Sequence, residues 1–131
     1  MLVGIGTDLA KIERFAAILE RRATAITRRL LTANEQAAMQ QAASKPAFLA
    51  KRFAAKEALL KALGTGLRHG LSWQDMEVSN DALGKPVMQL SGKAAELATA
   101  KGVTNIHLSI TDEKEMALAF VVLESLPTTK P

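Results

Sequence analysis

The chain has no cysteine, only two histidines and few aromatic residues. Without cysteine, a disulfide framework, a thiolate zinc site, an iron–sulfur cluster and a cysteine nucleophile are all excluded. The two histidines, His69 and His107, are too few for a histidine-rich metal site or a relay of several imidazoles. Aromatic residues make up 4% of the chain and tyrosine is absent, so nucleic-acid bases would find few stacking partners.

Long apolar segments are also absent. No apolar run approaches the ~20 residues that span a bilayer, and the first residues lack the basic region and cleavage site of a signal peptide. We therefore expect a soluble, cytoplasmic protein that does not bind a membrane. Its 131 residues, 48% hydrophobic and 23% charged, predict a single folded domain.

The positive charge of the chain is local. There are 17 basic and 13 acidic residues, a formal charge of +4. Residues 9–31 hold six basic and two acidic side chains, which accounts for the whole excess. This distribution predicts a basic patch that meets a local acidic surface, and it does not resemble a general coating for nucleic acid.

Apolar periodicity and turn-forming residues predict an α+β fold with a mostly antiparallel sheet packed against helices. We expect one compact domain over residues 1–126 and a flexible tail at 127–131. The expected strands are 1–8, 76–78, 87–90, 106–111 and 116–123. The expected helices begin at Leu9, with a second short piece at 25–31 after an interruption near Thr24, and continue at 33–42, at about 46–63 and from Ser91 to Gly102.

Residues at the ends of the predicted helices support these boundaries. Thr32-Ala33-Asn34-Glu35 has the form of a capping box that opens a helix. Pro46 suits the first turn of the long central helix, and Gly64 suits its end. Ser91 is expected to cap the helix that follows it.

Three charged residues of the long helix are candidates for chemistry. Helical spacing places Glu57 and Lys61 one above the other at the edge of the apolar side, and it places Lys56 inside the apolar arc. One hypothesis is a surface Glu–Lys pair worth a few tenths of a kcal/mol. The other is a carboxylate that binds a divalent metal while the lysines hold phosphate oxygens.

Asp8 also fits two hypotheses. It is either the cap of a following helix or an oxygen ligand at the end of a strand. Asp8 and Glu57 together would form a sparse site, which suits magnesium better than zinc because water and substrate phosphates supply the remaining ligands. Gly4-x-Gly6 and Gly64-x-Gly66 lack the spacing of a dinucleotide or P-loop motif.

Two further groups of side chains are candidates for binding. His107, Ser109 and Thr111 share one face of an alternating strand, and all three can donate hydrogen bonds to an anion, although a structural histidine is the simpler interpretation. Arg14, Arg21 and Arg28 are seven residues apart and would form one stripe on a continuous helix. That stripe is either a solvated face or a docking surface.

Taken in order, several segments resemble the holo-[acyl-carrier-protein] synthases, the short homotrimeric type of 4'-phosphopantetheinyl transferase. The resemblance runs from Met1 to about Glu124. One departure is Asp112, where many members have histidine. The matching segments are Gly4-Ile5-Gly6-Thr7-Asp8 with Ile12, Arg52-Phe53-Ala54-Ala55-Lys56-Glu57-Ala58, Lys61-Ala62-Leu63-Gly64-Thr65-Gly66, Gly84-Lys85-Pro86 and Ser109-Ile110-Thr111.

The resemblance implies transfer of 4'-phosphopantetheine from coenzyme A to a serine of apo-acyl carrier protein, with release of adenosine 3',5'-bisphosphate. It implies Mg²⁺ on Asp8 and Glu57, catalysis by Glu57 and Lys61, carrier-protein docking through Arg14, Arg21 and Arg28, and a homotrimer with active sites between subunits. The coenzyme A contacts that it implies are Arg52, Lys56, Lys61, Gly64, Pro86, His107, Ser109 and Thr111.

Two alternatives remain at this point. The arginine patch at 14–29 and the pI of about 9.6 also fit a basic nucleic-acid-binding module, against which stand the few aromatic residues and the neutral remainder of the chain. A catalytically inactive scaffold of the same fold is the other alternative. The presence of Asp8, Glu57 and Lys61 together argues against it.

Overall fold

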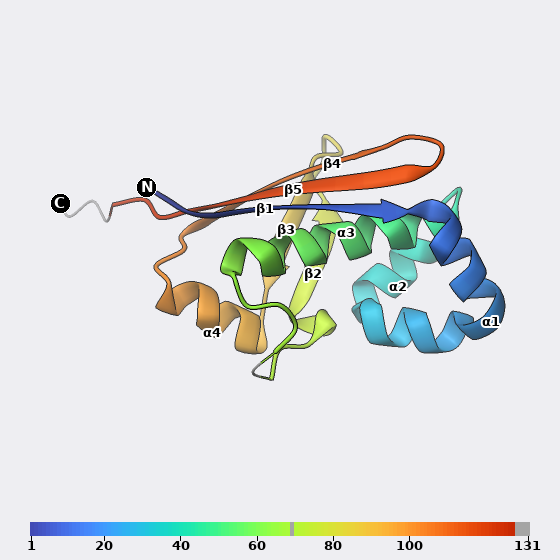
Figure 1. Ribbon diagram of the computed structural model, residues 1–131, viewed down its shortest axis with the longest axis horizontal. Coiled ribbons are helices and arrows are strands. Elements are labelled where there is room, and N and C mark those ends of the chain that lie inside the picture. Colours follow the sequence, from blue (N-terminus) through green and yellow to red (C-terminus); the bar gives the residue numbers. More distant parts are fainter. Residues whose placement is uncertain (69, 128–131) are drawn as a thin grey trace.

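The computed structural model describes residues 1–68 and 70–127, in which a three-stranded antiparallel sheet packs against a long helix (Figure 1). The sheet has the order β1 (Leu2–Lys11), β5 (Met116–Glu124), β4 (Asn105–Asp112). A separate hairpin consists of β2 (Met76–Asn80) and β3 (Pro86–Leu90). The helices are α1 (Ile12–Leu30), α2 (Ala33–Gln40), α3 (Lys45–Leu63) and α4 (Gly92–Ala100). The predicted α+β class is confirmed; residues 128–131 of the expected tail, and His69 in the loop before Trp73, lie outside the described part.

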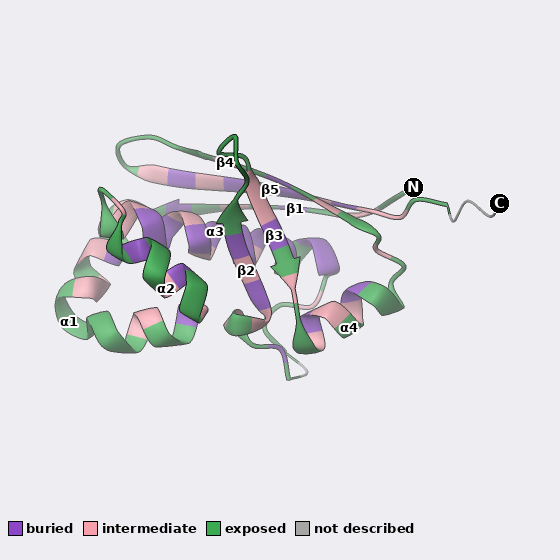
Figure 2. Ribbon diagram, turned by 180° about the vertical axis from the view of Figure 1, so that it is seen from behind, coloured by how far each residue is buried: buried purple, intermediate pink, exposed green. Residues whose placement is uncertain are grey.

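Helix α3 is the centre of the core, as predicted for residues 46–63. It runs along β1 and β5, and most of its residues are buried (Figure 2). Its sequence is rich in alanine and leucine, which are strong helix formers. Pro46 lies in its first turn, and Gly64 ends it in the left-handed conformation with φ of 79°. Because alanines line much of α3, neighbouring backbones approach it closely.

The glycines of β1 allow that close approach. A Cβ atom at Gly6 would overlap the carbonyl oxygen of Ala58, and one at Gly4 would overlap that of Ala62. Gly4-x-Gly6 is therefore a packing feature, in which the strand lies directly on the backbone of α3. Strand alternation then turns Asp8 toward the same helix.

Strand β1 is longer than predicted, and this changes the interpretation of Asp8. Leu9 pairs with Leu118 and Lys11 pairs with Met116, so the strand continues where a helix was expected. Helix α1 begins at Ile12, and its N-cap position is Lys11. The helix-cap hypothesis for Asp8 is therefore wrong, because Asp8 lies within a strand.

Two other local predictions need correction. The backbone of α1 leaves helical geometry at Arg22 (φ −145°, ψ 46°), two residues before the expected interruption at Thr24. Ser91 occupies the N-cap position of α4, but its side chain makes no capping hydrogen bond. Instead, the Ala94 N–H donates to Asp75 Oδ2 at 3.4 Å. The capping box of Thr32 and Glu35 is confirmed.

Candidate active site

Asp8, Glu57 and Lys61 meet where β1 lies on α3. Lys61 Nζ donates to Asp8 Oδ1 at 3.0 Å and to the carbonyl oxygen of Thr7 at 3.1 Å. Glu57 lies one helical turn before Lys61, on the same side of α3. The structure thus brings together the three residues that the sequence indicated for metal binding and catalysis.

Negative charge is not fully balanced at this point. Asp8 Oδ2 is buried and has no hydrogen-bond partner among the described residues. The pKa of the Glu57 carboxyl is raised, first by its burial and then by the neighbouring Asp8 carboxylate, while Lys61 and Arg14 lower it to a smaller extent. Two neighbouring carboxylates, one of which has a buried oxygen without a hydrogen bond, favour an additional cation.

The donor set fits magnesium. Hard carboxylate oxygens are the ligands that Mg²⁺ prefers, and the ion keeps several waters or phosphate oxygens in its shell. Within residues 1–68 and 70–127, no group of three or more His, Cys, Asp or Glu side chains is placed to hold a metal. Asp8 and Glu57 would therefore form a sparse site that needs oxygen ligands from a substrate.

Arg14 lies beside Glu57, and the sequence did not indicate this position for Arg14. Its guanidinium carbon is 5.2 Å from the centre of the Phe53 ring and 5.6 Å from that of Phe15. Phe53 is one helical turn before Glu57. Arg14 was predicted only as a docking residue, and its spacing from Arg21 gave no signal that it stacks on α3. The kink at Arg22 separates these two arginines from Arg28, so the three do not lie on one continuous helix.

Lys56 lies in the core and is fully buried, as its place in the apolar arc indicated. Its Nζ donates to the carbonyl oxygen of Leu30 at 2.6 Å, to Glu35 Oε1 at 2.6 Å and to the carbonyl oxygen of Trp73 at 3.1 Å. An ammonium group has three N–H donors, and all are used. The structure therefore leaves no donor of Lys56 for a phosphate.

Arg52 reaches a small hollow on the other side of α3. The hollow has a volume of about 200 Å³, and its lining residues are Lys51, Arg52, Asn80, Gly84, Pro86, Ile110 and Asp112. The Arg52 side chain is 8% exposed, and its Nε is buried without a hydrogen bond among the described residues. Its guanidinium lies 4.3 Å from the centre of the Phe48 ring. Nε lies 3.6 Å from Glu35 Oε2, an ion pair without a hydrogen bond. A guanidinium that lines a hollow is suited to an anion.

His107, Ser109 and Thr111 lie on the opposite face of the sheet from Asp8. Asp8 pairs with Ala119, which pairs with Ile110, and this row faces α3. Ser109 pairs with Phe120, which pairs with Thr7 on the other face. His107 Nε2 is 2.9 Å from Glu124 Oε1 on that face. Within one chain, these three donors do not meet the two carboxylates.

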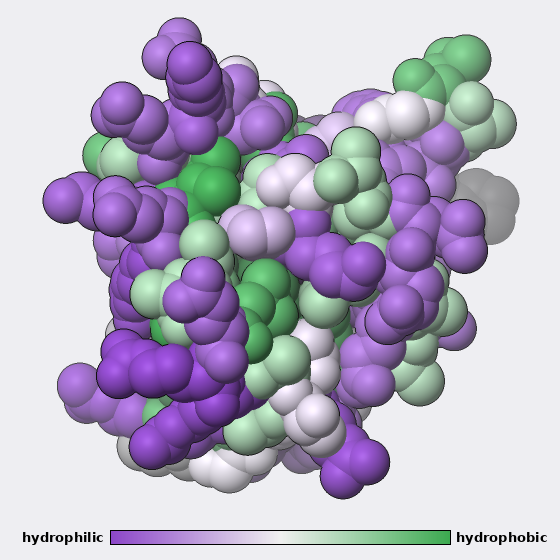
Figure 3. All heavy atoms as spheres, turned by 90° about the vertical axis from the view of Figure 1, so that its right-hand side faces the viewer, coloured by the Kyte–Doolittle hydropathy of each residue, from purple (hydrophilic) through white to green (hydrophobic). Residues whose placement is uncertain are grey.

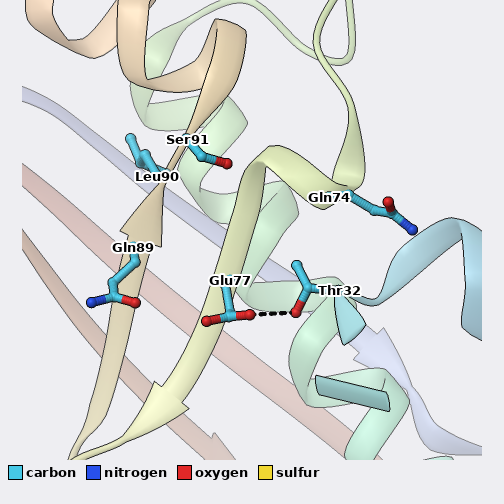
Figure 4. Close-up of a pocket in the computed structure, with 6 residues that line it drawn as sticks. All are labelled: Thr32, Gln74, Glu77, Gln89, Leu90 and Ser91. Carbon is cyan, nitrogen blue, oxygen red and sulfur yellow. Dashed lines mark hydrogen bonds between the residues drawn. The ribbon is translucent and has the colours of Figure 1, made fainter. Parts of the chain in front are cut away.

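A second hollow contains none of the predicted site residues. It has a volume of about 410 Å³ and lies between the start of α2 and the β2–β3 hairpin (Figure 4). Its lining residues are Thr32, Gln74, Glu77, Gln89, Leu90 and Ser91. Gln74 Nε2 donates to the carbonyl oxygens of Arg28 and Leu31, so this side chain holds the end of α1.

Comparison with known proteins shows the family of this chain. The family model described as the 4'-phosphopantetheinyl transferase superfamily matches residues 4–121. The holo-[acyl-carrier-protein] synthase of Vibrio vulnificus is 51% identical over 95% of this chain and 98% of its own. The chain therefore belongs to the 4'-phosphopantetheinyl transferase superfamily, and the predicted resemblance is confirmed.

Solved structures narrow the similarity within that superfamily. The holo-[acyl-carrier-protein] synthase of Neisseria meningitidis has a TM-score of 0.88 and 40% identity, over 95% of this chain and 100% of that one. The holo-(acyl-carrier-protein) synthase of Bacillus anthracis, in complex with CoA (3',5'-ADP), has a TM-score of 0.80 and 39% identity, over 96% and 99% of the two chains.

Proposed function

We propose that this chain transfers the 4'-phosphopantetheine group of coenzyme A to a serine of apo-acyl carrier protein. The serine oxygen forms a bond to the β-phosphorus, and the bond from that phosphorus to the bridging oxygen breaks. The products are holo-carrier protein and adenosine 3',5'-bisphosphate. The observation that carries this proposal is the meeting of Asp8, Glu57 and Lys61, in a chain about 50% identical to holo-[acyl-carrier-protein] synthases.

We assign the charges of this site to three tasks. Asp8 and Glu57 would hold Mg²⁺, which supplies charge neutralisation on the pyrophosphate when it is bound. Lys61 is half-exposed, and its hydrogen bonds to Asp8 and Thr7 leave one N–H donor that can stabilise or protonate the leaving phosphate. Glu57 is the candidate base for the serine proton, and its raised pKa makes it a stronger base than an ordinary carboxylate.

The remaining coenzyme A contacts follow from charge and position. Arg52 and Pro86 line the same hollow, and a guanidinium there, whose Nε makes no hydrogen bond among the described residues, is suited to a phosphate. Gly64 lies directly after the helical turn of Lys61, where its backbone is exposed. His107, Ser109 and Thr111 would contact phosphate oxygens from the open face of the sheet. Lys56 is withdrawn from this set because its donors are used internally.

The separation of these groups on two sheet faces supports a homotrimer with active sites between subunits. The open face of the sheet leaves large apolar residues accessible: Ile5 is 59% exposed, Leu9 58% and Phe120 39%. A second copy that covers this face would bury them. It would also bring the hydroxyl and imidazole donors of one chain toward the carboxylates of another.

The basic patch on α1 supports carrier-protein docking. Arg14, Arg21 and Arg28 are all exposed. Arg28 also lines a hollow of about 490 Å³ between α1 and α2, together with Leu19 and Met39. Figure 3 looks onto this end of the molecule, where hydrophilic side chains flank apolar atoms. A small acidic helical protein would find both charge complementarity and apolar contact here.

The test of the function is the intact mass of an apo-acyl carrier protein after incubation with this protein, coenzyme A and MgCl₂. We expect the carrier to gain one phosphopantetheine group. Asp8→Asn and Glu57→Gln should each lower the rate by more than ~100-fold while the far-UV circular dichroism stays unchanged. Lys61→Met should lower turnover by roughly 100-fold and change the KM for coenzyme A far less. No mass gain with the wild-type protein would refute the proposal.

Shared active sites have a separate test. Asp8→Asn disables one half of the site, and a His107→Ala/Ser109→Ala double variant disables the other. If each site is built by two chains, mixing the two inactive proteins under conditions that exchange subunits restores part of the transfer activity. If each chain holds a whole site, the mixture stays as inactive as its components.

A further inference from the structure

Three charged side chains, Glu35, Arg52 and Lys56, are buried in the core beside the active site. They are 1%, 7% and 0% exposed and are the buried charged residues of the described chain. The proposed mechanism uses neither Glu35 nor Lys56. Charged groups are rarely placed in a core, because removing them from water is unfavourable unless they are paired and hydrogen-bonded.

Lys56 connects α3 to three other segments. Its hydrogen bonds reach the last residue of α1 through the Leu30 carbonyl, the first turn of α2 through Glu35, and a 3₁₀ turn at Trp73–Asp75 through the Trp73 carbonyl. Burial lowers the pKa of Lys56, while the Glu35 carboxylate opposes that shift. The ammonium is thus held by directional contacts on three sides.

Glu35 completes the cluster with both of its oxygens. Oε1 accepts from Lys56 Nζ and from the Thr32 N–H at 2.9 Å. Oε2 accepts from the Val78 N–H at 2.9 Å and lies 3.6 Å from Arg52 Nε. Thr32 in turn donates through Oγ1 to Glu77 on β2 at 2.6 Å (Figure 4). One carboxylate therefore joins α2, β2 and two positions of α3.

The cluster touches both parts of the proposed site. Lys56 immediately precedes Glu57, about 100° away around the helix. Arg52, one turn before Lys56, lines the hollow with Pro86. A small rotation of α3 would therefore move Glu57 and Lys61 relative to Asp8, and would move Arg52 relative to the hollow.

We propose that Glu35 and Lys56 are positioning residues for phosphopantetheine transfer, which fix the rotation of α3 against α1, α2 and β2. Apolar packing is non-directional and would tolerate small rotations of α3 about its axis. A buried ion pair often adds no stability over an apolar pair, and a unique arrangement is what it supplies. This inference rests on the proposed transferase function.

The experiment compares Lys56→Met with the double variant Glu35→Met/Lys56→Met. Lys56→Met leaves the Glu35 carboxylate without its ammonium partner, so its melting temperature should fall. The double variant removes both charges and should regain part of that loss. We expect kcat to fall at least tenfold in both variants, with the KM for carrier protein within about twofold of wild type. Met88→Ala, a core truncation in β3, is the control for lower stability alone.

A second readout does not depend on turnover. Mn²⁺ should broaden the amide signals of residues 8 and 57 together in the wild-type protein, and both variants should need a higher Mn²⁺ concentration for the same effect. A normal kcat with unchanged broadening would overturn the inference, and so would recovery of kcat together with stability in the double variant. Failure of both variants to fold would also overturn it, because the cluster would then hold the fold itself. Wild-type protein without transfer activity would instead refute the proposed function, and the Mn²⁺ readout would still decide the positioning role.

Discussion

The two faces of the three-stranded sheet differ in the size of their side chains and in what covers them. The face toward α3 carries Gly4, Gly6 and the fully buried Ala117 and Ala119, so the helix lies close to the strands (Figure 1). The opposite face carries large apolar side chains such as Phe120 and remains exposed in the described chain. One face is covered by the chain itself, and the other is the face that the proposed homotrimer would cover.

The same division separates the functional groups. The carboxylates of Asp8 and Glu57 lie on the completed side, whereas His107, Ser109 and Thr111 lie on the open side. Close packing against α3 fixes the carboxylates without help from another chain. The anion donors have no such support, and assembly would bring them into a site. If the proposed homotrimer forms, folding and completion of the site depend on different faces of the sheet.

The largest expected effect comes from a side chain on the completed face. Gly6→Val would drive a branched side chain into the backbone of α3 at Ala58, which cannot move without shifting the helix. We expect a loss of more than ~4 kcal/mol in the free energy of unfolding, or no folded protein. Thermal denaturation followed by circular dichroism measures this. Thr7 is the neighbouring residue on the open face, and Thr7→Val should change the free energy of unfolding little. An equal loss in both variants would contradict the difference between the two faces of the sheet.

The next effect is expected on the open face. Phe120→Asp places a charge among the exposed apolar residues, so the chain should fold normally but no longer assemble. We expect a monomer in light scattering and a fall in transfer rate of ~100-fold or more, since each site would lose the donors of its neighbour. Leu83→Asp is the control, because Leu83 is 95% exposed in the β2–β3 turn. An assembled, active Phe120→Asp protein would contradict a role of this face.

Much of the completed face could be predicted from the sequence. The run of alanine and leucine at 46–63 marked the central helix, and Gly64 marked its end. Residues 116–123 were apolar enough to predict the central strand, and β5 does lie between β1 and β4. These features are local or strongly periodic, so a short window of sequence contains the information.

Long-range contacts could not be predicted. Lys56 was placed inside the apolar arc and interpreted as a phosphate contact, but it pairs with Glu35, which is 21 residues away and was assigned only to a capping box. Asp8 was expected at the end of a strand, but pairing with β5 extends the strand through Lys11. The division of the donors between two faces depends on strand register, which no single segment specifies.

A smaller effect is expected from the basic patch outside the sheet. Arg14→Glu/Arg21→Glu should raise the KM for carrier protein roughly tenfold and weaken its dependence on salt, while the KM for coenzyme A stays nearly constant. The matched control is Lys93→Glu on α4 combined with Lys101→Glu at the C-cap of α4, which changes the net charge equally. Because Arg14 also stacks on Phe53 beside Glu57, the single variant Arg21→Glu isolates docking. An unchanged carrier-protein KM in both arginine variants, or an equal rise in the lysine control, would refute docking through α1.

The smallest expected effect concerns the free energy of unfolding, which the ionised carboxylate of Glu57 lowers. Burial and Asp8 raise the pKa of Glu57 in the folded chain above its value in the unfolded chain. Between these two pKa values the folded state binds more protons, so stability falls as pH rises, and the loss is complete above the folded pKa. Glu57→Gln cannot ionise.

We therefore expect Glu57→Gln to be more stable than wild type at high pH without divalent cations, by a few tenths to about 1 kcal/mol because solvent screens this half-exposed group. The difference should vanish as pH falls below the unfolded pKa. Urea denaturation across pH measures it, with the exposed Glu20→Gln as the matched charge change. Added Mg²⁺ should then stabilise the wild type and not Glu57→Gln, since only the wild type keeps both carboxylates. Parallel stability curves for the two proteins at every pH would show that the charge of Glu57 is already balanced within one chain, and the site would then need no cation to complete it.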